Sequence, residues 1–595
     1  MKHLTEDHKS YSINKIKLTE SADLPKLDGN SVLIFDLSKV NNNAKDIFGN
    51  LLPYIKSSPK QTIFNFIGNH QMIAELAYLL EKGSDLYYQY LITLRKKISK
   101  EKSILPTETL LLLTVSKEKK VKMNRVLLPY TYCPECQKTT KDYGGKKHTF
   151  HHFGTTMSDV WKDVYFNKEE SIFNDENMLI VERIALMLSK RENTVLVFDL
   201  SKYSFLNGTE VVVDYPNIIN NEAKNEDKLK SYENEIISGN SLEVLKTLQS
   251  NSVDYVFIDP PYNLEKKYSS SSDDMEIEEY FKWCDEWIEE SLRVLKEGSF
   301  LSILNIPQWC IRHFAYLIQR ADFESWITWD SLSKPAGSVM PANYTILTFS
   351  KPTTDSSREN MQLNTNSKYM QPLKDGYCLR ASCIKKRSEV KTKPLTDLWT
   401  DIHRVKHNSL RYDHPCQLPS ELMKRIIDVY SKPGDLILDF FNGVGTTTLA
   451  ADLIERRYLG VDLDAKYVEV AKIRHQMIED GMDPFGKNAI NEDNKTKNNN
   501  LKRVAKRRPE HKHINKKEVQ LKMKELSYQI GRKPTIEDAL ENYPEIPKDF
   551  YELYFKSWSE VLVATKVEGV TESKEPLNKG KISKKRTYQE SFELL

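Results

Sequence analysis

The sequence predicts an α/β protein with a parallel, doubly wound sheet, a duplication of that fold along the chain, and a small helical region at the end. Three observations predict this architecture. Short apolar strings alternate with amphipathic segments between residues 253 and 463, the order typical of parallel sheets covered by helices. A weaker copy of the same order occupies residues 32–205. Helical periodicity returns near residue 518, after a polar stretch.

Length and composition exclude several classes of protein. A chain of 595 residues is too long for one hydrophobic core. Hydrophobic residues make up 39% and charged residues 29%, a balance that excludes wholesale disorder and collagen-like repeats. Seven cysteines over this length do not form a disulfide framework. No apolar run approaches the roughly 20 residues that cross a bilayer, and the first residues lack the apolar core of a signal peptide. We therefore expect a cytoplasmic protein with no membrane partner.

The strands and helices of the stronger copy follow from their periodicity. Strands are expected at 253–258, 299–306, 436–441 and 458–463, and helices at 278–295, 420–430 and 446–456. Ligands bind beyond the carboxyl ends of the strands in such sheets. Residues that directly follow a predicted strand are therefore the first candidates for a site.

The weaker copy matches the stronger one in order. Asp36 in VLIFDLSKV corresponds to Asp259 in VDYVFIDPPY, Leu113 to Leu347, and Asp199 to Asp439. Growing offsets between these pairs fit insertions in the second copy, and the alternative is chance recurrence of short β-rich strings. The first copy lacks the prolines and glycines that the second copy carries after its strands. We therefore predict that only the second copy holds a working site.

These patterns predict seven segments. They are an extension at 1–30, a first lobe at 31–215, a linker at 216–234, a second lobe at 235–480, a basic linker at 488–517, a helical region at 518–567 and a tail at 568–595.

Asp259, Pro260, Pro261 and Tyr262 follow directly on a predicted buried strand. The exocyclic amine of a nucleobase is a poor nucleophile because its lone pair is delocalised into the ring. A carboxylate that accepts one N–H, with a backbone carbonyl that accepts the other, localises that lone pair, and prolines fix the geometry. Tyr262 can stack on a base that has left its duplex. The alternative is an ordinary strand followed by a rigid turn.

A second motif lies between a predicted strand and a predicted helix. Glycines there let the backbone approach a ligand, and hydroxyls can bond it. An acid at the end of the next strand, Asp462, suits recognition of a ribose diol. The residues of the motif are Asp439, Phe441, Asn442, Gly443, Gly445 and Thr446.

Together these motifs resemble the S-adenosylmethionine-dependent amino-methyltransferases of DNA, whose signatures are D/N/S-P-P-Y/F/W and F-x-G-x-G. The catalytic motif comes first here, an order that resembles the β group, which includes modification subunits of type III restriction systems. Asn240 resembles a position beside the cofactor adenine, where many members have Asp. His414 and Pro415 in HPCQLP resemble the H-P-x-Q-K-P segment, although Leu418 replaces its usual Lys.

The resemblance implies a Rossmann-like methyltransferase fold over roughly residues 238–474 and direct transfer of a methyl group to a base amine without a catalytic metal. It implies that Asp259 and the Pro260 carbonyl orient the amine, and that Phe441, Gly443, Gly445 and Asp462 hold the cofactor. Adenine N6 is favoured over cytosine N4, because members with Asp at the first position are mostly adenine enzymes. The alternatives are an N4-cytosine enzyme, an RNA methyltransferase, and a non-catalytic DNA-binding protein with a relic site.

Three further features bear on recognition of DNA. Cys133, Cys136, His148 and His152 have near zinc-site spacing, with His151 as an alternative ligand, and predict a structural zinc ion. The basic run between Leu501 and Lys517 attracts phosphates. Residues 525–567 resemble the helical repeat found beside homing endonucleases, which implies a DNA-contacting module; a protein-interaction domain is the alternative. A restriction or other defence subunit is an expected partner, and the oligomeric state is open.

Overall fold

We analysed a computed structural model of the chain. It describes residues 12–17, 24–27, 31–99, 105–130, 132–133, 135–139, 154–189, 194–201, 203, 205–206, 213–217, 232–264, 275–331, 337–353, 371–372, 383, 392–405, 412, 417–485, 511, 514–555 and 557–562. The chain divides into two compact units. The first comprises residues 1–126, 157–373 and 388–491, and the second comprises residues 127–156, 374–387 and 492–595.

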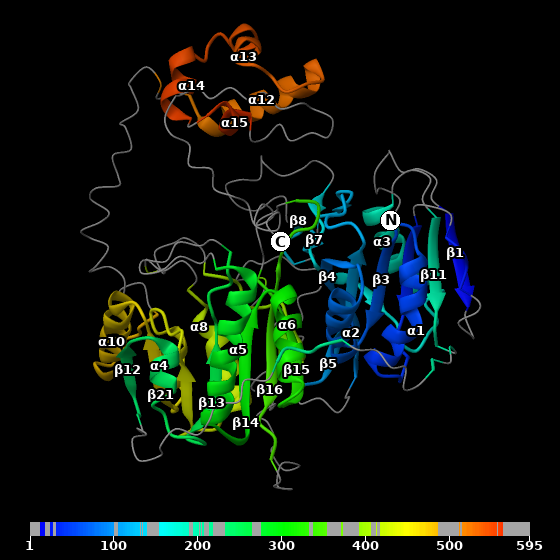
Figure 1. Cartoon of the computed structure of the whole chain (residues 1–595). Coiled ribbons are helices and arrows are strands. Elements are labelled where there is room, and N and C mark those ends of the chain that lie inside the picture. The colour runs from blue at the N-terminus through cyan, green and yellow to red at the C-terminus, as the bar shows by residue number, and fades with distance from the viewer. Residues whose placement is uncertain are drawn as a thin grey trace. The chain divides into compact units, whose positions relative to one another are not determined.

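The described part of the first unit holds two large sheets and one small one, and the N-terminal large sheet defines the first lobe (Figure 1). Its seven strands lie in the order β1-β11-β2-β3-β5-β4-β10. Their bounds are β1 Ser12–Lys17, β2 Ser31–Asp36, β3 Ile63–Gly68, β4 Tyr87–Ser99, β5 Thr107–Ser116, β10 Val160–Phe166 and β11 Thr194–Asp199, and the helices are α1 Ala44–Ser57, α2 His70–Gly83 and α3 Asp175–Leu188.

The second lobe contains an eight-stranded sheet in the order β12-β21-β20-β13-β14-β16-β15-β19. Its strands are β12 Glu235–Ser238, β13 Val253–Ile258, β14 Leu295–Asn305, β15 Asp322–Asp330, β16 Asn343–Ser350, β19 Leu398–Trp399, β20 Leu436–Asp439 and β21 Arg457–Asp462. Its helices are α4 Ser241–Leu245, α5 Ile277–Val294, α6 Pro307–Leu317, α8 Ser420–Tyr430, α9 Thr446–Asp452 and α10 Ala465–Glu479. A separate two-stranded sheet pairs β17 Gln371–Pro372 with β18 Thr392–Lys393.

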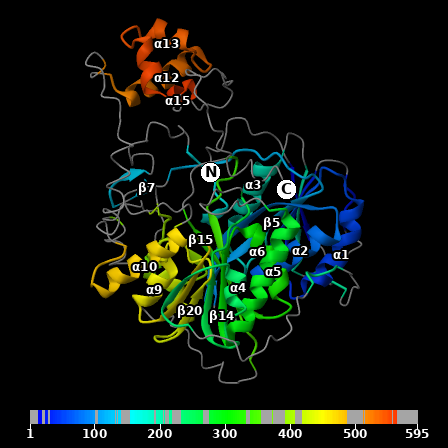
Figure 2. The same ribbon diagram turned by 60° about the vertical axis from the view of Figure 1, so that its left-hand side comes forward.

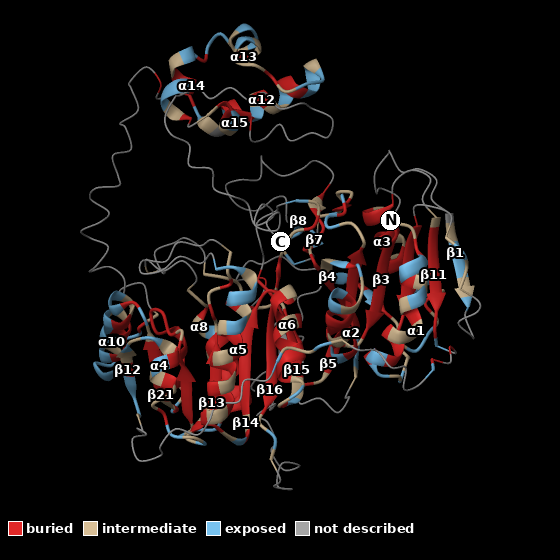
Figure 3. Ribbon diagram, viewed as in Figure 1, coloured by how far each residue is buried: buried red, intermediate tan, exposed pale blue. Residues whose placement is uncertain are grey.

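Helices on both faces explain the apolar strands. In the second lobe α4, α5 and α6 lie on one face of the sheet, and α8, α9 and α10 lie on the other (Figures 1 and 2). The central strands are therefore buried along their length, whereas the helices keep an exposed face (Figure 3). Continuous Val, Ile and Leu runs suit such doubly covered strands.

The two sheets share one topology. In each lobe a parallel pair (β2–β3 and β13–β14) is followed by an antiparallel strand (β5 and β16), then by an antiparallel neighbour (β4 and β15), and then by a parallel edge strand (β10 and β19). Even a bulge recurs, between Tyr88 and Tyr90 in β4 and between Phe323 and Ser325 in β15. This agreement supports the predicted duplication, and descent from one ancestor stays a prediction.

The structure differs from the expected fold at three places. The sheet is not wholly parallel, because β16 runs antiparallel to both its neighbours. The segment predicted as an extension contributes β1, which pairs with β11 at the sheet edge. The expected match of Asp199 with Asp439 is also wrong in register. When Asp36 is matched with Asp259, the pairings β11–β2 and β20–β13 make Val197, and not Asp199, the equivalent of Asp439.

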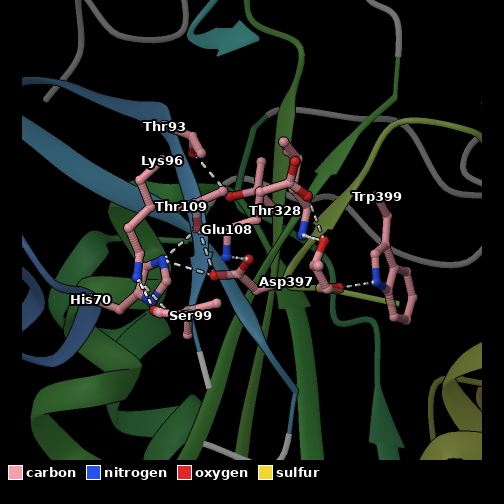
Figure 4. Close-up of polar contacts among 12 residues, drawn as sticks. His70, Thr93, Lys96, Ser99, Glu108, Thr109, Thr328, Asp397 and Trp399 are labelled. Carbon is pink, nitrogen blue, oxygen red and sulfur yellow. Dashed lines mark hydrogen bonds and ion pairs between the residues drawn. The ribbon is translucent and has the colours of Figure 1, made fainter. Parts of the chain in front are cut away.

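The lobes meet through equivalent residues. Counted through the strand pairings, Thr93 of β4 matches Thr328 of β15, and their hydroxyl oxygens lie 2.9 Å apart in a hydrogen bond (Figure 4). The helices α2 and α6, which follow the equivalent strands β3 and β14, lie side by side (Figures 1 and 2). A contact between equivalent elements is the property of a two-fold axis. The lobes are therefore related by an approximate two-fold axis within one chain.

Two equivalent aspartates extend this symmetry. Asp397, which precedes β19, accepts from the Glu108 backbone N at 2.6 Å and from the Thr109 hydroxyl at 2.7 Å (Figure 4). Asp159, which precedes β10, accepts from the Ala342 and Asn343 backbone N atoms at 2.8 and 3.0 Å. Each aspartate thus bonds the equivalent strand start of the other lobe.

Burial raises the pKa of both carboxyl groups to about 7, although the hydrogen bonds they accept oppose the shift. A buried carboxylate is costly unless its acceptors are filled. The interface therefore depends on these bonds.

The second unit contains a helical region and two short hairpins. The helices are α12 Lys516–Ile530, α13 Ile536–Asn542, α14 Lys548–Tyr554 and α15 Trp558–Val561. They share a core that includes Met523, Phe550 and Trp558. Thr535 forms a capping box with Asp538, and the Trp558 indole donates to the Pro534 carbonyl at 2.9 Å. The expected helical region is therefore present over its described part.

The hairpins of this unit come from the insertion after β5. They pair β6 Leu127–Leu128 with β9 Thr155–Thr156, and β7 Tyr132–Cys133 with β8 Lys138–Thr139. Among the described residues of the whole chain, no helix combines the length and apolar character that crossing a membrane requires.

We predict that the two interface aspartates make stability depend on pH. Since their folded-state pKa lies above the ordinary value of 3.8, the folded state binds extra protons between those values. Their contribution to the free energy of unfolding should therefore be greatest below pH 4 and fall as pH rises to about 7, by up to about 4 kcal/mol for each carboxyl. The double variant Asp159→Asn/Asp397→Asn should flatten this slope in urea unfolding. The exposed Asp322→Asn serves as the control, and an unchanged slope in the double variant contradicts the prediction.

Candidate active site

The candidate site lies at the carboxyl ends of three adjacent parallel strands. Strand β20 lies between β13 and β21. Asp259 follows β13, Asp439 ends β20 and Asp462 ends β21. Asp259 and Asp462 each raise the pKa of Asp439 through charge repulsion. The predicted acids of both motifs are therefore brought together at one edge of the sheet.

Hydrogen bonds hold the Asp-Pro-Pro-Tyr turn in one conformation. The Tyr262 hydroxyl donates to Asp259 Oδ1 at 2.7 Å. Tyr280 of α5 donates to the Pro261 carbonyl at 2.9 Å, and the Trp309 indole of α6 donates to the Tyr262 carbonyl at 2.8 Å. Within the described part of the chain, no donor bonds the Pro260 carbonyl. That carbonyl is therefore available to accept a hydrogen bond from a ligand.

Aromatic rings surround this turn. The Tyr262 and Tyr344 rings lie 6.1 Å apart, and Trp329 lies 5.7 Å beyond Tyr344. The guanidinium of Arg404 lies 5.8 Å from the Tyr344 ring. Sequence reasoning missed Tyr280, Trp309 and Tyr344. Each lies on a different element from the motif, so local spacing gave no signal for it.

The glycine loop has backbone angles that require glycine. Gly443 has φ +51° and Gly445 has φ +85°, a region that favours glycine over other residues. A Cβ on Gly445 would also lie 2.9 Å from the Ala471 Cβ. The Gly443 backbone N donates to Asp462 Oδ2 at 2.7 Å, and the Asp464 backbone N donates to Oδ1 at 2.9 Å. Asp462 therefore also fixes the shape of the loop.

Other residues of the cofactor motif pack inside the second lobe, where Asn442 is buried and Phe441 is partly buried. Phe441 packs edge-on against Trp283 and Trp287 of α5. Asn442 is buried and accepts from the Thr448 hydroxyl at 3.1 Å, while its amide nitrogen has no hydrogen-bond partner. Such an orphaned buried donor suits an absent ligand or water.

Burial dominates the titration of this site. It raises the pKa of Asp439 to about 7, and Asp259 and Asp462 add to that shift. The opposing hydrogen bonds come from the Phe441 backbone N, at 2.9 Å, and from Thr447. Burial also raises the pKa of Asp462. Thr446 is buried at the start of α9, but its neighbour Thr447 is the hydroxyl that bonds Asp439.

The remaining predicted site residues lie elsewhere or outside the described residues. The Asn240 side chain caps α4, where it accepts from the Leu242 backbone N at 3.0 Å. His414 and Pro415 lie outside the described residues, as do His148, His151 and His152. Cys133 and Cys136 belong to the second unit. A role of Asn240 beside a cofactor stays a prediction.

Comparisons with known proteins find relatives of the second lobe. The family model described as DNA methylase matches residues 253–473. The DNA adenine methyltransferase YhdJ of Escherichia coli (strain K12) is 30% identical over 252 residues, which cover 40% of this chain and 80% of that protein. The chain belongs to the DNA methylase family. The type II methyltransferase M.BamHI of Bacillus amyloliquefaciens is 34% identical over 236 residues, which cover 38% of this chain and 54% of that protein.

Among solved structures, the PvuII DNA methyltransferase, described as cytosine-N4-specific, matches with 20% identity and a TM-score of 0.30. The match covers 41% of this chain and 87% of that one. The DNA methylase match falls on the second lobe, and the first lobe lies outside it.

The first lobe differs from the DNA methylase lobe at the same strand ends. The Asp36 carboxylate accepts from the Ser38 backbone N at 2.9 Å, and Asp199 accepts from the Ser171 hydroxyl at 2.7 Å. Ile172, next to Ser171, is fully buried. When the two lobes are matched through their strand pairings, Lys17 at the end of β1 is the equivalent of Asp462 at the end of β21. Both lobes thus bond their acids to their own chain, but the first lobe carries a cation where the second lobe has Asp462.

Two glycines of the DNA methylase lobe allow a matched test of the loop. Gly434 has φ +86° with no atom within 4 Å of an added Cβ, whereas Gly445 has nearly the same φ but a close Ala471. We predict that Gly434→Ala costs about 1 kcal/mol of unfolding free energy through backbone strain alone. Gly445→Ala should cost at least about 1 kcal/mol more because of the steric overlap. Equal costs in urea unfolding would contradict the close approach.

Proposed function

We propose that the protein transfers a methyl group from S-adenosylmethionine to the N6 amine of adenine in DNA, at a specific site. The observation that carries this proposal is the fixed turn at residues 259–262. There a carboxylate and a backbone carbonyl without a described donor sit at the carboxyl end of β13. Membership in the DNA methylase family supports DNA as the substrate.

The turn suits activation of an amine. Asp259 would accept one N–H of the base amine and the Pro260 carbonyl the other, so that the nitrogen lone pair points away from both acceptors. Tyr280 and Trp309 bond the next two carbonyls, which prevents the turn from shifting when the amine binds. No residue needs to form a covalent bond to the substrate. The positive charge of the methylated amine is then relieved by loss of a proton, for which Asp259 is the nearest base.

The neighbouring strand ends suit a positively charged cofactor. S-adenosylmethionine supplies a methyl group on a sulfonium cation. Asp439 and Asp462 are carboxylates with raised pKa values in a buried site, and such a site favours a nearby cation. We propose that the glycine loop and Asp462 hold the cofactor, with Phe441 against it. Asn442, whose buried amide lacks a partner, is a further donor for it.

Base stacking on Tyr262 belongs to the same proposal. The Tyr262 residue is 6% exposed and its ring faces Tyr344. A flipped base would therefore have to enter beside Tyr344 or displace it. The preference for adenine rests on Asp at position 259, as in the adenine enzymes that the motif resembles.

The wider setting is also proposed. Type II methyltransferases among the relatives support a role in restriction and modification. The chain spans 54% of the length of M.BamHI and 76% of the length of the type II methyltransferase M.HpaI of Haemophilus parainfluenzae. The helical region α12 to α15 is proposed to contact DNA. A structural zinc ion at the Cys133–Cys136 hairpin completes the proposal.

Incubation of unmethylated DNA with the protein and S-adenosylmethionine tests the reaction. Nucleoside mass spectrometry should detect N6-methyladenine, and Asp259→Ala should lower its rate at least about 100-fold because the amine loses its acceptor. Asp36→Ala changes the matching acid of the first lobe and should leave the rate within about twofold of the wild type, since that lobe takes no part in the transfer.

The product also decides between the candidate substrates. Detection of N4-methylcytosine in place of N6-methyladenine would show that the target base is cytosine. Methylation of RNA but not of DNA would overturn the proposal, as would equal loss of activity in both aspartate variants that remain folded.

Cofactor binding should depend on the ionisation of Asp439. With its pKa raised to about 7, this carboxyl is neutral at lower pH and attracts a cation only once it has ionised. We predict that affinity for S-adenosylmethionine, measured by calorimetry, rises as pH increases from 6 to 8 and then levels off. Asp439→Asn should remove most of this rise, whereas Asp199→Asn in the first lobe should preserve it. A pH profile that is unchanged in Asp439→Asn contradicts the prediction.

A further inference from the structure

Three cysteine thiols come together in the second unit. The sulfur atoms of Cys133, Cys136 and Cys383 all lie within 4.8 Å of one another. Cys133 and Cys383 are buried, and Cys136 is partly buried. Sequence spacing predicted the first two residues but not Cys383, which lies far along the chain. Its segment carried no recognisable motif.

The hairpin β7–β8 presents two of these thiols. Cys133 ends β7, and its backbone pairs with Lys138 at the start of β8. Gln137 between them has φ +55°, a left-handed conformation that is uncommon outside glycine. The tight turn therefore brings the Cys-x-x-Cys pair to one side, a spacing typical of zinc-binding hairpins.

The third thiol arrives from the equivalent insertion of the other lobe. Residues 117–159 connect β5 to β10 in the first lobe, and residues 351–397 connect β16 to β19 in the second. These are matching connections in the shared topology. Cys133 and Cys136 come from the first insertion and Cys383 from the second. The cluster thus joins the two insertions.

Zinc explains this cluster better than packing or a disulfide does. The three cysteines form a cluster of their own, with no other apolar side chain among the described residues. So small a cluster provides little hydrophobic stabilisation, and segments of this size usually need a metal or a disulfide. A disulfide between two of the three cysteines would not account for the position of the third. Tetrahedral zinc with Zn–S bonds of about 2.3 Å places its sulfur ligands roughly 3.8 Å apart, which fits within the observed separation.

We propose that Cys133, Cys136 and Cys383 bind one zinc ion through three thiolates and thereby tie together the matching insertions of the two lobes. Each thiol loses its proton to solvent as its Zn–S bond forms, and zinc keeps its oxidation state. Three thiolates leave one position of the tetrahedron for a further ligand. This inference rests on the zinc part of the proposed function and not on methyl transfer. It adds Cys383 to the predicted set, whose histidines lie outside the described residues.

Metal content of the purified full chain tests the site. We expect about one zinc per wild-type chain by mass spectrometry of the metal. In chelator competition, Cys383→Ser and Cys133→Ser should each weaken zinc binding at least about tenfold, since each removes one thiolate. Cys310→Ser changes a buried cysteine of α6 and should leave both content and affinity unchanged.

Cobalt substitution counts the thiolates without relying on activity. Co²⁺ bound to the wild type should give a thiolate-to-metal absorption band, and Cys383→Ser should lower its intensity by about a third. If Cys133→Ser loses zinc while Cys383→Ser keeps wild-type affinity and band intensity, the role of Cys383 is overturned but zinc binding stands. Absence of zinc from the wild type, with no uptake of added Zn²⁺ or Co²⁺, overturns both.

Discussion

The hydrogen bonds that Asp159 and Asp397 make across the lobe interface are the constraint on which the first unit depends. Each aspartate uses its backbone carbonyl to bond the neighbouring strand of its own sheet, at Thr93 or Thr328, and its side chain to bond the other lobe. Each aspartate therefore takes part both in the hydrogen bonding of its own sheet and in the contact with the other lobe. Because both lobes use this aspartate in the same way, the contact has an approximate two-fold axis.

The two sequence motifs of the site were predictable from sequence, whereas the side chains on other helices that hold the first motif in place were not. Asp259 to Tyr262 and the glycine loop each follow a single strand, so their position at the sheet edge follows from the strand itself. Tyr280 and Trp309 fix the turn from two different helices, and no periodicity indicates such a contact. The sequence places two adjacent threonines, Thr446 and Thr447, after the glycine loop. Adjacent helix positions point about 100° apart, and it is Thr447 that bonds Asp439.

The fold, too, was predictable from sequence only in part. The bounds predicted for β13 and α8 agree with the structure, because a buried strand and an amphipathic helix leave their period in the sequence. Strand direction leaves no such record, so the antiparallel course of β16 was missed. The short, polar β1 was missed because an edge strand needs little apolar character. Cys383 lies about 250 residues from Cys133 in sequence, so local spacing gave no signal for their meeting, and only the shared topology of the two insertions explains it.

Fusion of the two lobes in one chain changes how their interface can evolve. In a dimer of identical subunits every substitution appears on both sides of the axis, so a change must suit both places at once. Here each side changes alone. Arg95 pairs with Glu108 within the first lobe, whereas the matching positions in the second lobe hold Asp330 and Ala342, and Asp330 pairs instead with Lys162. A single chain therefore permits opposite charges at matching positions of the two lobes.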